Sequence, residues 1–580
     1  MKGSALRFAV ACVAAWAVTA TGFAAPPPAP PPPPVTPGQV KSTLPTQSAL
    51  PAQGPAPVSN TATNPQGVAP GGEAILVKGF EIDGNAVIPT SELQIQIAGY
   101  VGKSLTLSEL YDVADVLTRY YRAKGYGLAD VTLPAQTLHS GTVRLQVIEG
   151  RLGKISVQGN VRTHDAVVQK RIEGLHSGDV YTDSAAERAV LLLNDLPGVG
   201  ARAVLSPGTE FGTSDLLFNM DETHYTGDAS VDDYGRSVIG RWRINADANI
   251  NSFTGNGDQL GAGITHSDGD RLNFGKLSYA LPVGPSGGTF TGSFNRAEYH
   301  GLFSSGVSSA AAAELPFSGA TENAGLNWQY PEIRSSERSL YWGAGLTYDR
   351  SNSEESLPSA PPEKTVTTQI VLLQLSSLYT RVWQDQSNVT ISSSLWTNGK
   401  HYANLNPPVP GPSQQINQRD ERARAEVDSS WLATLADDWS LVNQLNVAYS
   451  VNPLTDADKF NLGGPGSVLG YQAAEQRGDS GYFISSELQR SFSWGPYWPM
   501  VWGLFLDNGK VWDKQATPST AALGQTPDTS RGISSAGLDL QLLPSADKLN
   551  ARLQWAYSIG RKPTDGDGGG HIWLSVGMTF

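Results

Sequence analysis

Apolar and polar residues alternate along the last ten residues of the chain, from His571 to Phe580. One set consists of Ile572, Leu574, Val576, Met578 and Phe580, and the other of His571, Ser575, Gly577 and Thr579, with Trp573 as the apolar exception. Successive side chains of a strand point to opposite faces, so this segment has one apolar face and one mostly small or polar face. A tilted strand crosses a bilayer with roughly 9–11 residues. The pattern therefore predicts a membrane-crossing strand.

The same alternation continues upstream, where no helical period is found after about residue 225. Leu549, Ala551, Leu553, Trp555, Tyr557 and Ile559 alternate with Asn550, Arg552, Gln554, Ala556 and Ser558. A barrel in lipid needs an apolar exterior, and a water-filled lumen needs polar residues. At about 20–25 residues per strand with its connection, residues 224–580 would form an all-β transmembrane barrel of roughly 14–18 antiparallel strands. A soluble sandwich or propeller is the alternative, and it does not explain the terminal strand.

Residues 73–149 and 150–223 show a different pattern, in which strands flank segments with a helical period. In the first unit, a strand over 75–82 precedes a helix from about Ser91 and a second helix with a Thr106/Glu109 capping box. The second unit repeats the plan with a helix around 164–173 and another that Ser184 and Glu187 are expected to cap. Two tandem α+β units are therefore predicted before the barrel.

The first 72 residues do not have the pattern of a packed domain. Residues 1–24 combine Lys2 and Arg7 with an apolar run and small residues at a cut after Ala24, as in a signal peptide. An uncleaved anchor, or a lipoprotein signal at Cys12, is the alternative. Residues 25–72 are rich in proline and predict an extended spacer with little room for a helix before residue 73. No later run of 18 apolar residues exists, so strands would cross the membrane.

The composition narrows the range of functions that the chain could have. Charged residues make up 16% of the chain, against roughly 25% in soluble proteins. The net charge of −13 gives nucleic-acid binding no electrostatic support. Cys12 is the only cysteine, and the eight histidines lack metal-ligand spacing. Asp565 to Gly568 lacks the later carboxylate of a calcium loop, so we expect a solvated hairpin there. No catalytic residues, metal or cofactor are predicted, and the chain is not expected to be an enzyme.

The order of these segments resembles the two-partner secretion transporters (TpsB-type, haemolysin secretion/activation), which carry two polypeptide-transport-associated (POTRA) domains before a barrel of sixteen strands. Short segments similar to the family occur in order: Gly125-Tyr126, Leu133 to Gln136, Glu149-Gly150, Leu192 to Val199, Asp232 to Gly235, Gly257 to Leu260 and Tyr279 to Pro282. The resemblance implies an outer-membrane pore of a Gram-negative bacterium with periplasmic POTRA domains. These domains would recognise an unfolded secreted partner, a large adhesin-like or haemolysin-like protein, for translocation to the surface. It also implies that Phe580 signals to the barrel assembly machinery.

Two further motifs resemble the family's pore loop and the strand that it meets. Phe460 to Tyr471 is similar to a loop that folds into the barrel, which gives Gly463, Gly464, Val468, Leu469, Gly470 and Tyr471 as candidate loop residues. Phe505, Asp507 and Gly509 match the strand motif. Alternation places Phe505 and Asp507 on the face of the strand toward the lumen, and Leu504 and Leu506 on the face toward lipid. In the family a loop arginine pairs with this aspartate, but here Leu469 takes its place. We expect backbone contacts and packing of Tyr471 to hold the loop, with Arg477 as a possible substitute partner.

Two other functions remain open at this point. An assembly factor that inserts other barrels would share the fold and the loop, but such factors usually carry three or more POTRA repeats. A surface enzyme or adhesin displayed on a barrel would need catalytic residues or a large passenger domain, and the sequence contains neither. Two repeats therefore favour secretion.

Overall fold

The computed structural model describes residues 37–44, 58–60, 74–136, 141–304, 314–355, 364–406, 422–495, 498–514, 529–543, 549–564 and 570–580. The expected signal peptide over 1–24, the proline run at 30–34 and the hairpin at 565–568 lie outside these residues.

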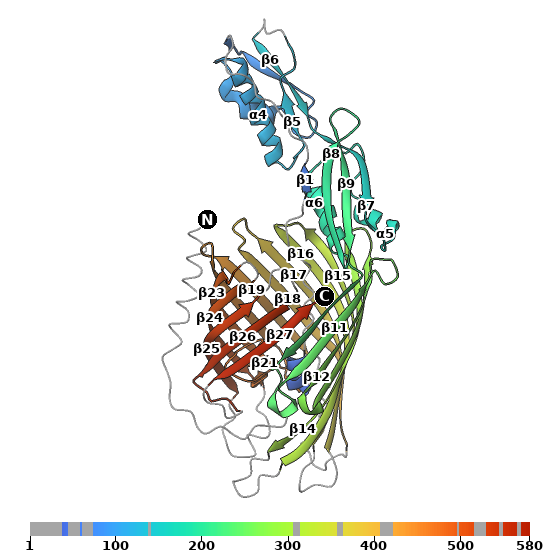
Figure 1. The fold of residues 1–580 in the computed structure, drawn as a ribbon, viewed down its shortest axis with the longest axis vertical. Helices are drawn as coiled ribbons and strands as arrows, with labels where there is room; N and C mark the ends of the chain where they lie inside the picture. Colours follow the sequence, from blue (N-terminus) through green and yellow to red (C-terminus); the bar gives the residue numbers. More distant parts are fainter. Residues whose placement is uncertain are drawn as a thin grey trace.

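The first α+β unit packs two helices on a three-stranded sheet (Figure 1). Its elements are β2 (Ile75–Leu76), β3 (Gly79–Asp83), α3 (Thr90–Ile97), η1 (Ala98–Tyr100), β4 (Ser104–Leu105), α4 (Leu107–Ala123), β5 (Asp130–Thr132) and β6 (Thr142–Ile148). β3 runs parallel to β6, which runs antiparallel to β5. The predicted capping box is confirmed, because the Thr106 side chain accepts from Glu109 N while the Thr106 N–H donates to Glu109 at 2.7 Å.

The second unit has the same order of elements, which confirms the repeat. It contains β7 (Arg151–Gln158), α5 (Asp165–Arg171), α6 (Asp183–Asn194), β8 (Val199–Pro207) and β9 (Thr213–Glu222). The predicted cap by Ser184 and Glu187 is wrong: Thr182 is the N-cap, and it makes no side-chain capping bond. Glu187 instead accepts a hydrogen bond from Ser336 N at 2.9 Å, in a turn of the barrel.

The spacer contributes two short elements, so the expectation that it leaves little room for a helix is wrong. Helix α2 spans Pro37–Thr43, and strand β1 (Val58–Asn60) pairs in parallel with β8. Proline at the start of a helix costs little, since the first helical N–H groups lack intrahelical partners anyway. A helix this short is marginal in water, so packing against other elements must stabilise it.

The remainder of the described chain forms a closed barrel of sixteen strands, in which each strand pairs with its neighbours and β27 pairs with β10 (Figure 1). The strands are β10 (Tyr225–Asp232), β11 (Arg243–Asn251), β12 (Gln259–Ser267), β13 (Leu272–Val283), β14 (Gly288–Ser304), β15 (Glu314–Arg334), β16 (Arg338–Glu355), β17 (Lys364–Val382), β18 (Asn388–Asn406), β19 (Ala423–Thr434), β20 (Trp439–Ser450), β23 (Ser480–Ser493), β24 (Pro499–Trp512), β25 (Ser530–Leu542), β26 (Leu549–Ile559) and β27 (His571–Thr579). Short helical turns η2 (Ser237–Ile239), η3 (Asp268–Asp270) and η4 (Asp456–Asp458) lie in connections. The predicted all-β barrel is confirmed.

The two faces of the barrel wall follow the predicted alternation. On β24, Leu504 and Leu506 are 48% and 43% exposed, whereas Phe505 and Asp507 are buried on the lumen side. On β27, Ile572 and Met578 are exposed outward. No helix among the described residues is long and apolar enough to span a membrane.

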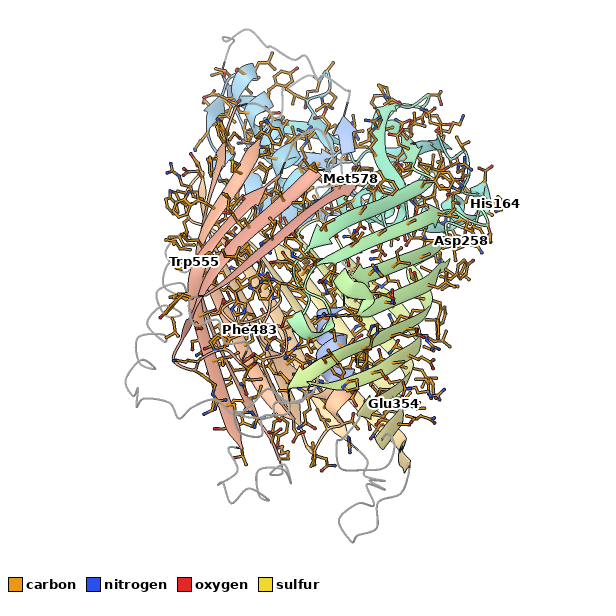
Figure 2. The ribbon with its side chains drawn as sticks, turned by 60° about the horizontal axis from the view of Figure 1, so that its bottom comes forward. His164, Asp258, Glu354, Phe483, Trp555 and Met578 are labelled. Carbon is orange, nitrogen blue, oxygen red and sulfur yellow. The ribbon has the colours of Figure 1, made fainter. Side chains whose placement is uncertain are left out.

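The second unit is fixed to the barrel turns that lie on its side of the barrel, such as the turn between β15 and β16. Arg334, at the end of β15, donates to both carboxylate oxygens of Asp195 at 2.8 and 3.0 Å, and its side chain is almost fully buried. Arg171 of α5 donates to the Gly284 carbonyl at 3.2 Å. His164 lies beside the turn that carries Asp258 (Figure 2), and the backbone N–H of His164 donates to Gly255 O at 2.9 Å. These bonds hold the unit over the barrel entrance.

Candidate functional site in the barrel lumen

The connection between β20 and β23, residues 451–479, folds back into the barrel and fills part of its lumen. It forms a small ladder from β21 (Phe460–Leu462) and β22 (Gln476–Gly478), with a compact tip between them. Gly463 and Gly464 have φ angles of 105° and 95°, a region that strongly favours glycine. The tip closes through the Gly464 N–H, which donates to Tyr471 O at 2.8 Å.

The structure brings together the candidate residues that the sequence separates. Val468 and Tyr471 pack in one buried cluster with Leu462 and Phe483, and Leu469 packs in a second with Phe505. Two glycines allow the close approach of loop and wall. A Cβ atom added at Gly470 would lie 2.7 Å from Ser535 Cβ, and one at Gly509 would lie 2.6 Å from a Leu462 methyl carbon.

Asp507 is fully buried, and only neutral groups donate hydrogen bonds to it among the described residues. The Leu469 N–H donates at 3.1 Å, Ser485 Oγ at 2.7 Å and Ser535 Oγ at 2.9 Å. Arg477 lies on β22 and is not one of these donors. The backbone of the loop therefore meets the aspartate directly.

Tyr471 anchors the other end of the tip. Its ring is buried and its hydroxyl donates to Arg561 O at 2.7 Å, beyond the end of β26. Nearby, Thr564 N–H donates to Glu475 at 2.8 Å, and Gln472 donates to Thr564 Oγ1 at 2.8 Å. Backbone contacts and the packing of Tyr471 are both present at the tip, and the Lys459–Asp513 ion pair at 2.9 Å adds a charged contact between loop and wall. That the first two contacts hold the loop stays a prediction.

Helix α2 lies inside the barrel beside the loop (Figure 1). Lys41 Nζ lies 3.1 Å from Asp349 of β16, and Gln39 donates to Ala474 O of the loop at 3.3 Å. Arg243 of β11 donates to the Thr43 carbonyl, and Val40 packs against Ile239 and Leu272. A polar cavity of about 480 Å³ remains between the helix, the loop and the wall, lined in part by Lys41, Asp349, Arg424, Ser467 and Phe483.

Sequence reasoning missed two participants in this site. Helix α2 has no clear signal in the sequence, because its residues Gly38, Val40, Ser42 and Thr43 have low helix propensity and the surrounding segment is rich in proline. Trp573 was noted only as the exception to an alternating strand. Its indole N–H donates to Leu469 O at 2.7 Å.

The predicted assembly signal lies away from the lumen. Phe580 closes the seam between the first and last strands, where its N–H donates to Gly227 O at 2.9 Å and its carbonyl accepts from Gly227 N at 3.0 Å. Its ring is half exposed on the outer face.

Comparison with known proteins agrees with this architecture. Residues 212–530 match the model of the haemolysin secretion/activation protein family ShlB/FhaC/HecB, and residues 75–150 match the ShlB-type POTRA domain. The heme/hemopexin transporter protein HuxB of Haemophilus influenzae (strain 86-028NP) is 24% identical over 444 residues, covering 73% of this chain and 74% of that protein. The hemolysin transporter protein ShlB of Serratia marcescens is 24% identical over 437 residues, covering 73% of each.

Solved structures show the same fold. CdiB from Escherichia coli aligns with a TM-score of 0.65 at 18% identity, covering 91% of this chain and 94% of that chain. CdiB from Acinetobacter baumannii aligns with a TM-score of 0.58 at 17% identity, covering 91% and 95%. The family match spans more than half of the sequence, and the described residues form the expected barrel behind a POTRA domain. The chain belongs to the haemolysin secretion/activation family, whose members are outer-membrane transporters of two-partner secretion with periplasmic POTRA domains.

Proposed function

We propose that this chain receives an unfolded secreted partner on its periplasmic units, both POTRA domains, and conducts it through the barrel to the cell surface. The observation that carries the proposal is a lumen occupied by two removable elements, α2 and the loop over 451–479. Both are held by hydrogen bonds, apolar packing and two ion pairs, Lys41–Asp349 and Lys459–Asp513, and neither contributes a strand to the wall. They close the pore until a partner arrives.

The edge of β8 is the proposed receiving site for the partner. β8 pairs with β9 along its length, whereas among the described residues its other edge pairs only with β1, from Ala203 to Leu205. An extended segment of another protein can add to such an edge through main-chain hydrogen bonds. An incoming partner segment would take the place of β1.

The class of partner follows from similar proteins. We infer a large adhesin-like or haemolysin-like protein, since one relative is named a hemolysin transporter and another a heme/hemopexin transporter. We also infer that the barrel assembly machinery inserts this chain, and that the chain itself transports and does not catalyse.

The test compares the extracellular and surface proteins of a strain with and without this chain. We expect one or a few large proteins to disappear from the outside when the chain is absent, and to return when it is supplied again. A variant with proline at Ala203 of β8 serves as the specific probe, because the Ala203 N–H faces away from β9 and proline cannot donate to an added strand. It should lower export, provided that the barrel is present at normal amounts.

An unchanged set of extracellular proteins would contradict secretion. A general fall in the amounts of other outer-membrane barrels would instead indicate an assembly factor.

A further inference from the structure

We propose that Trp573 is the residue that positions the pore loop in this chain, by holding the peptide groups around Leu469 from the last strand of the barrel. This inference concerns the loop that the proposed function places in the pore. It assigns a role to a residue that interrupts an otherwise small or polar lumen face.

The first argument is the hydrogen-bond geometry around Leu469. Its N–H donates to Asp507 of β24 at 3.1 Å, and its carbonyl accepts from Trp573 Nε1 of β27 at 2.7 Å. The indole group can only donate, so a buried tryptophan needs an acceptor. Leu469 is thus held from both sides by two different strands of the wall.

The second argument is packing. Trp573 is 2% exposed, although it lies on the lumen face, because the loop covers it. The Leu469 side chain packs with Trp573, Phe505 and Ala556. Tyr234 meets the indole edge-on at a centroid distance of 6.1 Å, and His571 stacks on it at 5.4 Å. These ring contacts hold the indole in the orientation that directs its N–H to Leu469.

The third argument is that Leu469 itself carries no charge or side-chain donor. The side chain therefore cannot bind Asp507, and the polar attachment of this residue depends on its backbone. Loss of the indole N–H would leave the buried Leu469 carbonyl without this donor, which typically costs enough to shift an equilibrium about tenfold.

The experiment uses the purified full chain in planar bilayers. We expect Trp573→Phe, which keeps an aromatic ring but removes the N–H, to raise the ratio of open to closed time roughly tenfold. The matched control is Trp555→Phe on the adjacent strand β26. Trp555 is 44% exposed on the outer wall (Figure 2), and its substitution should leave the ratio unchanged.

A rescue variant tests whether a second polar bond at position 469 can replace the one that Trp573 makes. Adding Leu469→Arg to Trp573→Phe places a cation beside the buried Asp507, and the smaller phenyl ring leaves room for it. The charge-assisted bond should restore the closed state to near the wild-type ratio.

Folding is checked by the heat-modifiable electrophoretic mobility of each variant. A wild-type ratio in Trp573→Phe, or an increased ratio that Leu469→Arg does not reduce, would overturn the proposal. If the Trp573→Phe barrel folds only when Leu469→Arg is also present, the proposal is supported. If neither the single nor the double variant folds, the proposal is refuted. The bilayer recording needs no partner protein, so its outcome is independent of whether secretion is the function.

Discussion

Asp507 shows how a single buried carboxylate can organise a loop without a cation. Burying such a group is costly unless donors surround it. Here two serine hydroxyls and one backbone N–H supply them, all within 3.1 Å. Because one donor belongs to the loop and two belong to the wall, the satisfied state of Asp507 requires the loop to be docked. Docking of the loop therefore completes the set of hydrogen-bond donors around the Asp507 carboxylate.

At the same scale, we predict that Phe580→Ala lowers the amount of folded barrel in the membrane severalfold. The Phe580 ring packs so closely over Gly227 that a Cβ atom at Gly227 would lie 2.6 Å from it. Loss of the ring weakens the joint that closes the barrel, and it removes the proposed signal for the assembly machinery. Heat-modifiable mobility of the membrane fraction measures the effect.

The matched control for this prediction is Met578→Ala, which removes another outward side chain of β27 from a residue whose exposed fraction is similar. Equal folded amounts for Phe580→Ala and the wild type would show that the terminal ring is dispensable.

At the level of elements, α2 is held in the lumen by contacts with the wall and the loop. Its Lys41–Asp349 ion pair is the main charged contact, and the Lys41 side chain is about three-quarters buried. We predict that Lys41→Met raises the frequency of large conductance steps in planar bilayers, because Asp349 loses its cationic partner while the aliphatic volume is kept.

The control for the α2 prediction is Lys78→Met, which changes the same type of residue in the first POTRA domain, outside the lumen. Identical traces for Lys41→Met and the wild type would mean that α2 does not close the pore.

Elements also show which parts of the structure the sequence could predict. Alternation on β24 and β27 identified the lumen and lipid faces, since a strand exposes successive side chains to opposite sides. The contact between Trp573 and Leu469 could not be predicted, because 104 residues separate the two positions. The predicted cap at Ser184 is wrong because tertiary contacts compete with the local capping motif. Glu187 binds Ser336 of the barrel instead.

At the scale of the whole molecule, the second α+β unit, residues 150–223, is joined to the barrel by several hydrogen bonds and the Arg334–Asp195 ion pair. We predict that Arg334→Ala frees this domain, because removing one partner of a buried ion pair costs about 3–5 kcal/mol and leaves Asp195 without its cation. Spin labels at Phe211→Cys and Leu435→Cys, both exposed in the wild type, should then give a broader distance distribution.

Arg338→Ala is the control for this prediction, since Arg338 is an exposed arginine in the neighbouring turn. An unchanged width for Arg334→Ala would show that the remaining bonds, such as Arg171 to the Gly284 carbonyl, are sufficient to fix the domain.

The short joint of the barrel has a mechanical consequence. β10 and β27 pair over Asp228–Asp232 and Ser575–Thr579, with further backbone bonds at Gly227–Phe580 and Asp233–Leu574, whereas β16 and β17 pair from Arg338 to Glu355 and from Lys364 to Arg381. β9 ends at Glu222 and β10 begins at Tyr225, so only two residues separate the sheet of the second α+β unit from the strand pair of the wall with the shortest ladder. A polypeptide that pulls on that sheet would therefore load the β10–β27 pair first, and this is the place where the barrel wall can separate most easily.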